Sequence, residues 1–246
     1  MYSFGSGCLI GTRTDIANGT PINFGLVQAV TIDETATIKE LYGQNQRAVA
    51  IARGTIKTTG KATVAKISGI ALASLFYGFV PAAGQLATSF GEAGSGAIPT
   101  TPFQLTVTNS ATFVDDLGVI YAATGLPFTK VASAPTIGQY SVAAGIYLFA
   151  AADTGKTVLF SYTYTIAALG QKFVVTNQLL GTTPTFSCQF YTTFQGQALS
   201  LKINNCTSSK LAMASKLEDF TIPEFDFSCF ADAAGNIMTW SFGEAS

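Results

Sequence analysis

The stretch at residues 47–67, RAVAIARGTIKTTGKATVAKI, constrains the fold most strongly because its side chains alternate in character. From 53 to 63 the odd positions are arginine, lysine or threonine, and the even positions are mostly small or apolar. A period of two is typical of a β-strand with one face in solvent and the other on a core. The threonines and two glycines disfavour the alternative, a helix with a cation at every fourth residue. The sequence therefore predicts a strand about twice the usual length.

Similar signals continue through most of the chain. Short runs rich in β-branched and aromatic residues, separated by turn residues, fill 103–166 and resume after 169, which is typical of a sandwich or barrel. At 68–78 a serine, a run of apolar residues and a glycine predict one short helix. At 208–218 both a strand and a short helix fit the pattern. We therefore expect an all-β, mainly antiparallel, sandwich or barrel-like protein with one short flanking helix.

Two stretches are expected to be irregular. Residues 33–46 are the most charged part of the first half and are predicted to form a long hairpin loop, either a solvated turn or a functional element. Residues 80–102 are rich in glycine, alanine and proline and are predicted to be a connection. The expected organisation is one β domain made of 1–99 and 167–246, with an N-terminal arm, and a β-rich segment at 100–166. An inserted immunoglobulin-like domain is one interpretation of that segment.

Composition favours association with other chains. Charged residues make up 11% of the 246 residues, hydrophobic residues make up 48%, and the mean hydropathy is +0.37. A lone monomer of this kind would expose an unusually apolar surface. The uncharged stretch 67–91 is long enough for a membrane span but is interrupted by glycine, serine and proline, and no signal peptide is evident. We expect a cytoplasmic, self-associating protein without membrane insertion.

The residue types argue against common catalytic chemistry. There is no histidine, which excludes Ser-His-Asp and Cys-His nucleophile systems, and no phosphate-binding glycine motif occurs. The cysteines are widely separated, which favours buried free thiols over a zinc site (Cys8, Cys188, Cys206 and Cys229). Adjacent carboxylates stand beside turns, where solvation is the usual state. A net charge of −1 excludes a strongly basic nucleic-acid binder. We expect neither enzymatic activity nor a cofactor or metal.

The cations Arg53, Lys57 and Lys61 form a stripe along the predicted strand. Three interpretations fit it. Lysine on a solvated sheet edge discourages unwanted strand pairing. The stripe could instead face a channel or a neighbouring subunit, or contact nucleic-acid phosphates. The residues themselves leave all three open.

Three segments, in this order, together resemble the major tail tube protein of long-tailed bacteriophages. They are VTIDETATIKELYGQNQRAVAIARGTIKTTGKA at 30–62, DLGVIYAATGLPFTKVASAPTIGQYSVAAGIYLFAAADTGKTVLFSYTYT at 116–165 and SSKLAMASKLEDFTIPEFDFSCFADAAGNI at 208–237. The resemblance implies a virion structural protein that forms hexameric rings stacked into a tube, through which DNA passes without sequence specificity. It also implies assembly in the host cytoplasm and contacts with terminator, tape-measure and tip proteins of the tail.

The resemblance also implies roles for particular residues. It assigns ring stacking to the loop at 33–46 (Asp33, Glu34, Lys39, Glu40, Tyr42 and Arg47), a channel or inter-subunit face to the stripe (Arg53, Lys57 and Lys61), and terminal-arm contacts to the N-terminus (Tyr2, Phe4, Leu9 and Ile10). Tube lumens of this family are commonly negative, so the positive stripe departs from the family pattern. Two alternatives stay open: an immunoglobulin-like binding or decoration module of a virion or cell surface, and the secreted tube of a contractile secretion system.

Overall fold

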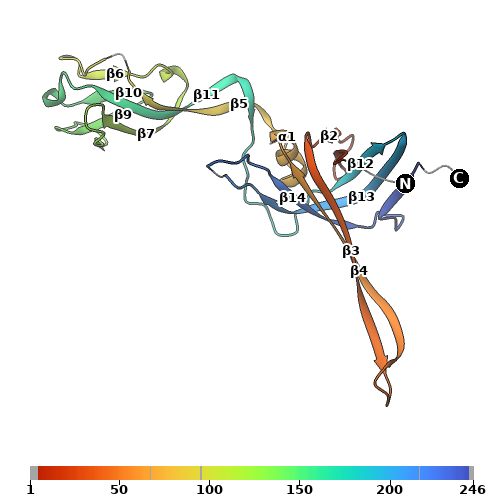
Figure 1. Ribbon diagram of the computed structural model, residues 1–246. Helices are drawn as coiled ribbons and strands as arrows, with labels where there is room; N and C mark the ends of the chain where they lie inside the picture. The colour runs from red at the N-terminus through yellow and green to blue at the C-terminus, as the bar shows by residue number, and fades with distance from the viewer. Residues whose placement is uncertain (1–4, 67, 95, 216, 244–246) are drawn as a thin grey trace. The chain divides into compact units, whose positions relative to one another are not determined.

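The computed structural model describes residues 5–66, 68–94, 96–215 and 217–243 (Figure 1). The described chain is mainly antiparallel β-sheet with one short helix, as the sequence predicts. It divides into two compact units. The first combines Met1–Pro81 with Phe173–Ser246, and the second is the continuous segment Ala82–Lys172.

One eight-stranded sheet forms the first unit. Its strand order is β2-β1-β12-β13-β14-β4-β3, with β15 also paired to β13, and every pair is antiparallel. The strands are β1 (Cys8–Arg13), β2 (Ile22–Asn23), β3 (Val27–Tyr42), β4 (Ala48–Val64), β12 (Phe186–Phe194), β13 (Gln197–Ala212), β14 (Glu224–Phe230) and β15 (Met238–Phe242). Gln195 and Gly196 join β12 to β13 with φ values of 50° and 80°, which suits a tight two-residue hairpin turn.

The predicted short helix is confirmed. The Ser68 side chain accepts a hydrogen bond from the backbone N–H of Ala71 at 3.3 Å and so caps α1 (Gly69–Ala71). The helix continues as a π-helical turn, η1 (Leu72–Phe76). Its Leu75 side chain is fully buried in the core of the first unit. The helix therefore serves as a cover for the sheet.

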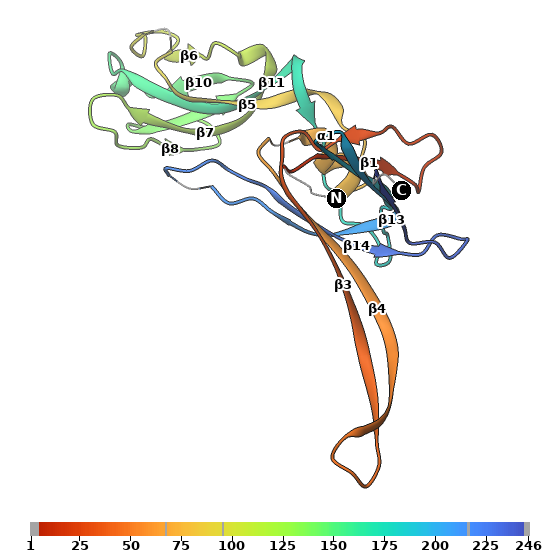
Figure 2. The ribbon, with the colours of Figure 1, turned by 45° about the vertical axis from the view of Figure 1, so that its right-hand side comes forward.

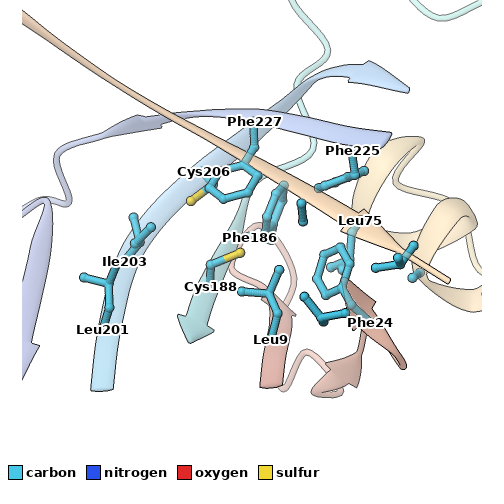
Figure 3. Packing of buried hydrophobic residues seen from close by; sticks show 14 residues of the cluster. Leu9, Phe24, Leu75, Phe186, Cys188, Leu201, Ile203, Cys206, Phe225 and Phe227 are labelled. Carbon is cyan, nitrogen blue, oxygen red and sulfur yellow. The ribbon is translucent and has the colours of Figure 1, made fainter. Parts of the chain in front are cut away.

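Phenylalanine rings pack with aliphatic side chains and cysteines in the core of the first unit (Figure 3). The rings of Phe24 and Phe225 meet edge to face with centroids 5.3 Å apart. Phe227 is fully buried, and a Cβ added to Gly60 would stand 2.2 Å from its Cζ atom. The Phe227 ring therefore lies directly over the backbone at Gly60, its partner across the β14–β4 pair. Glycine at position 60 is a packing requirement of this core.

The long strand predicted at 47–67 is confirmed as β4, but its alternation of burial covers only one half. Thr58, Gly60, Ala62 and Val64 are buried, whereas the odd positions between them are partly exposed. From 49 to 57 every residue is exposed. This half of the strand packs on no core within its own unit.

The loop predicted at 33–46 is wrong for most of its length. β3 continues to Tyr42, and only residues 43–47 turn the chain into β4. Pairing with β4, interrupted by three register shifts, extends from Val27, opposite Val64, to Tyr42, opposite Ala48. Charged side chains are compatible with this strand because its outer half has solvent on both faces. That same exposure removes the apolar alternation by which a strand is usually found.

The second unit consists of two sheets that share one core. A three-stranded sheet has the order β5-β11-β7, and a four-stranded sheet has the order β6-β10-β9-β8, in which β8 and β9 are parallel. The elements are β5 (Ala82–Glu92), β6 (Gln104–Thr106), η2 (Ser110–Thr112), β7 (Phe113–Tyr121), β8 (Thr129–Lys130), β9 (Gln139–Ala143), β10 (Ile146–Phe149), η3 (Ala151–Asp153) and β11 (Val158–Lys172). Tyr147 from β10 and Phe160 from β11 are fully buried, with ring centroids 4.6 Å apart.

The connection predicted at 80–102 is largely wrong, because β5 occupies Ala82–Glu92 and pairs along β11. The second unit accordingly begins at Ala82 and ends at Lys172, where the sequence placed the segment at 100–166. Gly84 and Gly91 lie within β5 at φ values of 95° and 68°, so glycine here marks irregularities in a strand instead of a linker.

Two smaller differences lie toward the C-terminus. The sequence predicts that short strands resume after 169, but β11 ends at Lys172 and the chain is irregular from there to the start of β12. At 208–218 the strand interpretation holds as far as Ala212, the end of β13, and no helix forms among the described residues of that stretch.

Candidate functional site

The outer half of the β3–β4 hairpin projects beyond the sheet of the first unit (Figures 1 and 2). Large apolar side chains lie along it, each between 46% and 70% exposed (Ile38, Leu41, Tyr42, Val49, Ile51 and Ile56). We call residues 33–57 the projecting hairpin. An isolated two-stranded ribbon is marginally stable in water, and an apolar one is a surface suited to another protein.

The register of the hairpin mixes charged and apolar groups on one face. Ile38 stands opposite Arg53, and Glu40 stands opposite Ile51. These pairs are two residues apart on each strand, so all four side chains share a face. The hydroxyl of Tyr42 donates a hydrogen bond to the Glu40 carboxylate on the same strand. This face offers a partner both apolar contact and charge.

All residues predicted for ring stacking lie on the projecting hairpin. Asp33, Glu34, Lys39, Glu40 and Tyr42 are on β3, and Arg47 is in the turn at the tip. Each of them is exposed. They are distributed along a ribbon instead of gathering in one loop, because residues 33–42 are strand.

The cation stripe is divided by a bulge in β4. Ala36 pairs with Ile56 but Ile38 pairs with Arg53, so β4 has one extra residue between these pairs. Lys57 stands opposite Thr35. Positions 35 and 38 of a continuous strand lie on opposite faces, so Arg53 and Lys57 do as well. The single face predicted for the stripe is therefore not formed.

Lys61, the third cation of the stripe, has partners within its own unit. Its Nζ atom lies 2.9 Å from a Glu224 carboxylate oxygen, and the Lys210 Nζ atom lies 3.6 Å from the other oxygen of the same carboxylate. The hydrogen bond from Lys61 lowers the pKa of Glu224. Of the stripe, Arg53 and Lys57 are left as exposed cations on the projecting hairpin, which also carries Lys39 and Arg47.

The N-terminal arm, to which the resemblance assigns contacts with other subunits, is part of the sheet from Cys8 onward. β1 pairs with β12 along its whole length. Leu9 is 1% exposed and belongs to the core, whereas Ile10 on the opposite face is 36% exposed. Leu9 therefore packs within its own chain because alternation along β1 directs it inward. The other predicted arm residues, Tyr2 and Phe4, lie outside the described residues.

Sequence reasoning missed a buried carboxylate in the second unit. Asp116 was expected to be solvated beside a turn, but its side chain is 2% exposed. It accepts hydrogen bonds from the hydroxyls of Tyr140 at 2.7 Å and Tyr147 at 2.9 Å, from the Gly118 N–H at 3.1 Å, and from Lys130 Nζ at 3.1 Å. Burial alone would raise the pKa of Asp116, but these donors outweigh burial and lower it.

Two further carboxylates of the second unit are bound in the same manner. Asp153 is fully buried and accepts from Lys156 at 2.7 Å and from the Gly138 N–H at 2.9 Å. Glu92 accepts from the Tyr162 hydroxyl, and from the backbone N–H of Thr108 at 2.8 Å. These carboxylates hold strands and loops of one unit together, which is a structural role.

The described part of the chain gives no indication of a metal site or a membrane-spanning helix. Within the described ranges no group of three or more histidine, cysteine, aspartate or glutamate side chains is placed to hold a metal ion. No helix in the part of the chain that the structure covers is long and apolar enough to cross a membrane. No protein-family model matches the chain, and a search of curated proteins finds no match.

Proposed function

We propose that this chain is a structural protein that assembles with copies of itself into stacked rings, hexameric by its resemblance to tail tube proteins, and so forms the tube of a bacteriophage tail. The observation that carries the proposal is the projecting hairpin. It places apolar and charged side chains on a ribbon that has no core beneath it in its own subunit.

The sheet of the first unit supports such an assembly. β3 is the last strand in the sheet order, and among the described residues it pairs only with β4. An open strand edge with unpaired backbone groups is suited to pairing with another chain. Ring closure needs a heterologous contact of this kind, in which one edge of a subunit meets a different surface of the next.

The proposed role is mechanical. The subunits act through contacts with each other and with terminator, tape-measure and tip proteins, need no cofactor, and carry out no reaction. DNA passes through the tube without sequence-specific contacts. The protein in this proposal belongs to the virion tail and assembles in the host cytoplasm. The carboxylates in the core of the second unit fit this role because their oxygens are engaged by donors of the same unit.

One observation favours a different function, that of a binding or decoration module. The second unit has a core of its own, with aromatic residues from both of its sheets. A self-contained β-domain of this kind can serve recognition independently of any tube. The two proposals differ in what they require of the projecting hairpin, which only the tube proposal uses for assembly.

The test replaces residues 37–55 with Asn-Gly, a dipeptide that favours tight hairpin turns. Pairing from Val27 to Ala36 is retained, and the core of the first unit lies entirely outside the deletion. We expect a folded variant with an unchanged Trp240 fluorescence spectrum that no longer forms rings or tubes in negative-stain electron microscopy.

Point variants refine this test. Val49→Asp alters a side chain that is 70% exposed on the hairpin, and Leu126→Asp is a matched control at 62% exposure in the second unit. The proposal requires the first variant to reduce assembly at least tenfold in sedimentation velocity and the second to leave it unchanged. Normal tubes from the truncated chain would refute a role for the hairpin in assembly.

A further inference from the structure

Two cysteines of the first unit lie opposite each other on neighbouring strands. Cys206 of β13 pairs with Cys229 of β14, and their Sγ atoms are 3.8 Å apart. Opposed residues of an antiparallel pair have Cα atoms about 4.5–5.5 Å apart, which is within the range of about 4.4–6.8 Å that disulfides span. A bond between these thiols therefore requires side-chain rotation and little movement of the backbone.

The surroundings give the two thiols different access to solvent. Cys206 is fully buried among the aromatic rings of the core, together with the Cys188 thiol of the adjacent strand β12 (Figure 3). Cys229 is partly exposed. Hydrogen bonding between the thiols and burial raise the pKa of Cys229. Cys229 is thus the sulfur that a small reagent reaches first, and it is protonated for most of the time at neutral pH.

We propose that Cys206 and Cys229 form a cross-strand disulfide when the folded protein meets a small disulfide such as oxidised glutathione. The Cys229 thiol loses its proton and attacks one sulfur of the reagent, which releases one small thiol and leaves a mixed disulfide. The Cys206 thiol then loses its proton, attacks the Cys229 sulfur and displaces the second small thiol. Two protein thiols are oxidised and one reagent disulfide is reduced to two thiols.

The bond would fasten the chain at a defined place. It would join β13 to β14 and close the intervening chain, which includes the irregular stretch after Ala212 and the exposed Phe220. Closing a loop of this length restricts the unfolded chain more than the folded one. We expect the Tm of the first unit to rise by about 5–10 °C on oxidation.

Peptide mapping tests the pairing directly, because each cysteine lies on a different tryptic peptide: 1–13, 173–202, 203–210 and 217–246. The native full-length protein is treated with oxidised glutathione, alkylated, digested without reductant and analysed by mass spectrometry. We expect peptides 203–210 and 217–246 to be joined, with the loss of two hydrogen atoms, and to separate on reduction. A bond from 203–210 to 173–202, a stable glutathione adduct at Cys229, or no crosslink would each overturn the proposal.

Two variants separate the proposed pair from its neighbour. Cys188→Ala removes the third thiol of the core, and the crosslink should form in it as in the parent chain. Cys229→Ala removes one proposed partner, so the Tm increase on oxidation should disappear while the reduced protein still folds, as judged by its Trp240 fluorescence. Loss of the crosslink in a folded Cys188→Ala variant, or an unchanged Tm increase in Cys229→Ala, would contradict the assignment.

Discussion

Replacing Asp116 with alanine should destabilise the second unit selectively. The substitution leaves the hydroxyls of Tyr140 and Tyr147, which are 2% and 0% exposed as residues, without their shared acceptor. Each buried polar group left unsatisfied costs about 1–3 kcal/mol, so the two hydroxyls together cost about 2–6 kcal/mol. For a unit of this size, that loss corresponds to a fall in Tm on the order of 10 °C or more.

The assay can separate the two units because the only tryptophan, Trp240, lies in β15 of the first unit. Urea unfolding is followed by Trp240 fluorescence for the first unit and by hydrogen exchange of peptides within Ala82–Lys172 for the second. We expect Asp116→Ala to lower protection in the second unit and leave the fluorescence transition unchanged. Asp116→Asn keeps an acceptor oxygen and the side-chain shape, so it should cost less than Asp116→Ala.

A cost below about 0.5 kcal/mol for Asp116→Ala would place it among ordinary surface substitutions and refute the network as a source of stability. Equal costs for the alanine and asparagine variants would show that hydrogen-bond acceptance is not what stabilises the unit.

Three other predictions concern pH, packing and assembly. Hydrogen bonds lower the pKa of Asp116 in the folded protein, so the ionised carboxylate stabilises the second unit fully above its unfolded pKa, near pH 4. This stabilisation is lost as the pH falls through the lower folded pKa. When hydrogen exchange is followed during acid titration, protection of the second unit should therefore fall more steeply in the parent than in Asp116→Asn. Gly60→Ala forces a Cβ against the Phe227 ring and should destabilise the first unit by about 1–3 kcal/mol in urea unfolding. The control Gly69→Ala places its Cβ in open space and should not destabilise the unit. Equal effects of the two substitutions would contradict the packing argument. Arg53→Glu combined with Lys57→Glu should change the Tm little, because both residues are exposed, but should reduce assembly in sedimentation velocity. Normal assembly of this double variant would show that neither cation contributes to the subunit interface.

Features with a local cause could be predicted from the sequence. The strand β4 follows from alternation between residues 53 and 63, and the helix after Ser68 follows from its cap and apolar run. Both signals depend on neighbours a few residues apart. Prediction failed at 33–42 because a ribbon with solvent on both faces has no apolar alternation to detect. It failed at β5 because its small residues become a strand only by pairing with β11, which is distant in sequence.

The arrangement around Asp116 also depends on distant residues. Its tyrosine partners are 24 and 31 positions away and reach it only after two sheets have packed on one core. The relevant signal was the presence of tyrosines at positions that become buried, since a buried hydroxyl needs a partner. Similarly, Leu9 points into the core only because β1 pairs with β12, which is distant in sequence, so its burial could not be predicted from the N-terminal residues alone. The extended ribbon at 33–42 was not predicted, and contacts of the projecting hairpin with other subunits stay a prediction.

The most direct test of the proposed assembly is electron microscopy of the purified full-length chain across a range of protein and salt concentrations. The account predicts hollow rings and stacks of rings with a constant diameter and an open bore. Particles that stay strictly monomeric under all of these conditions would contradict it.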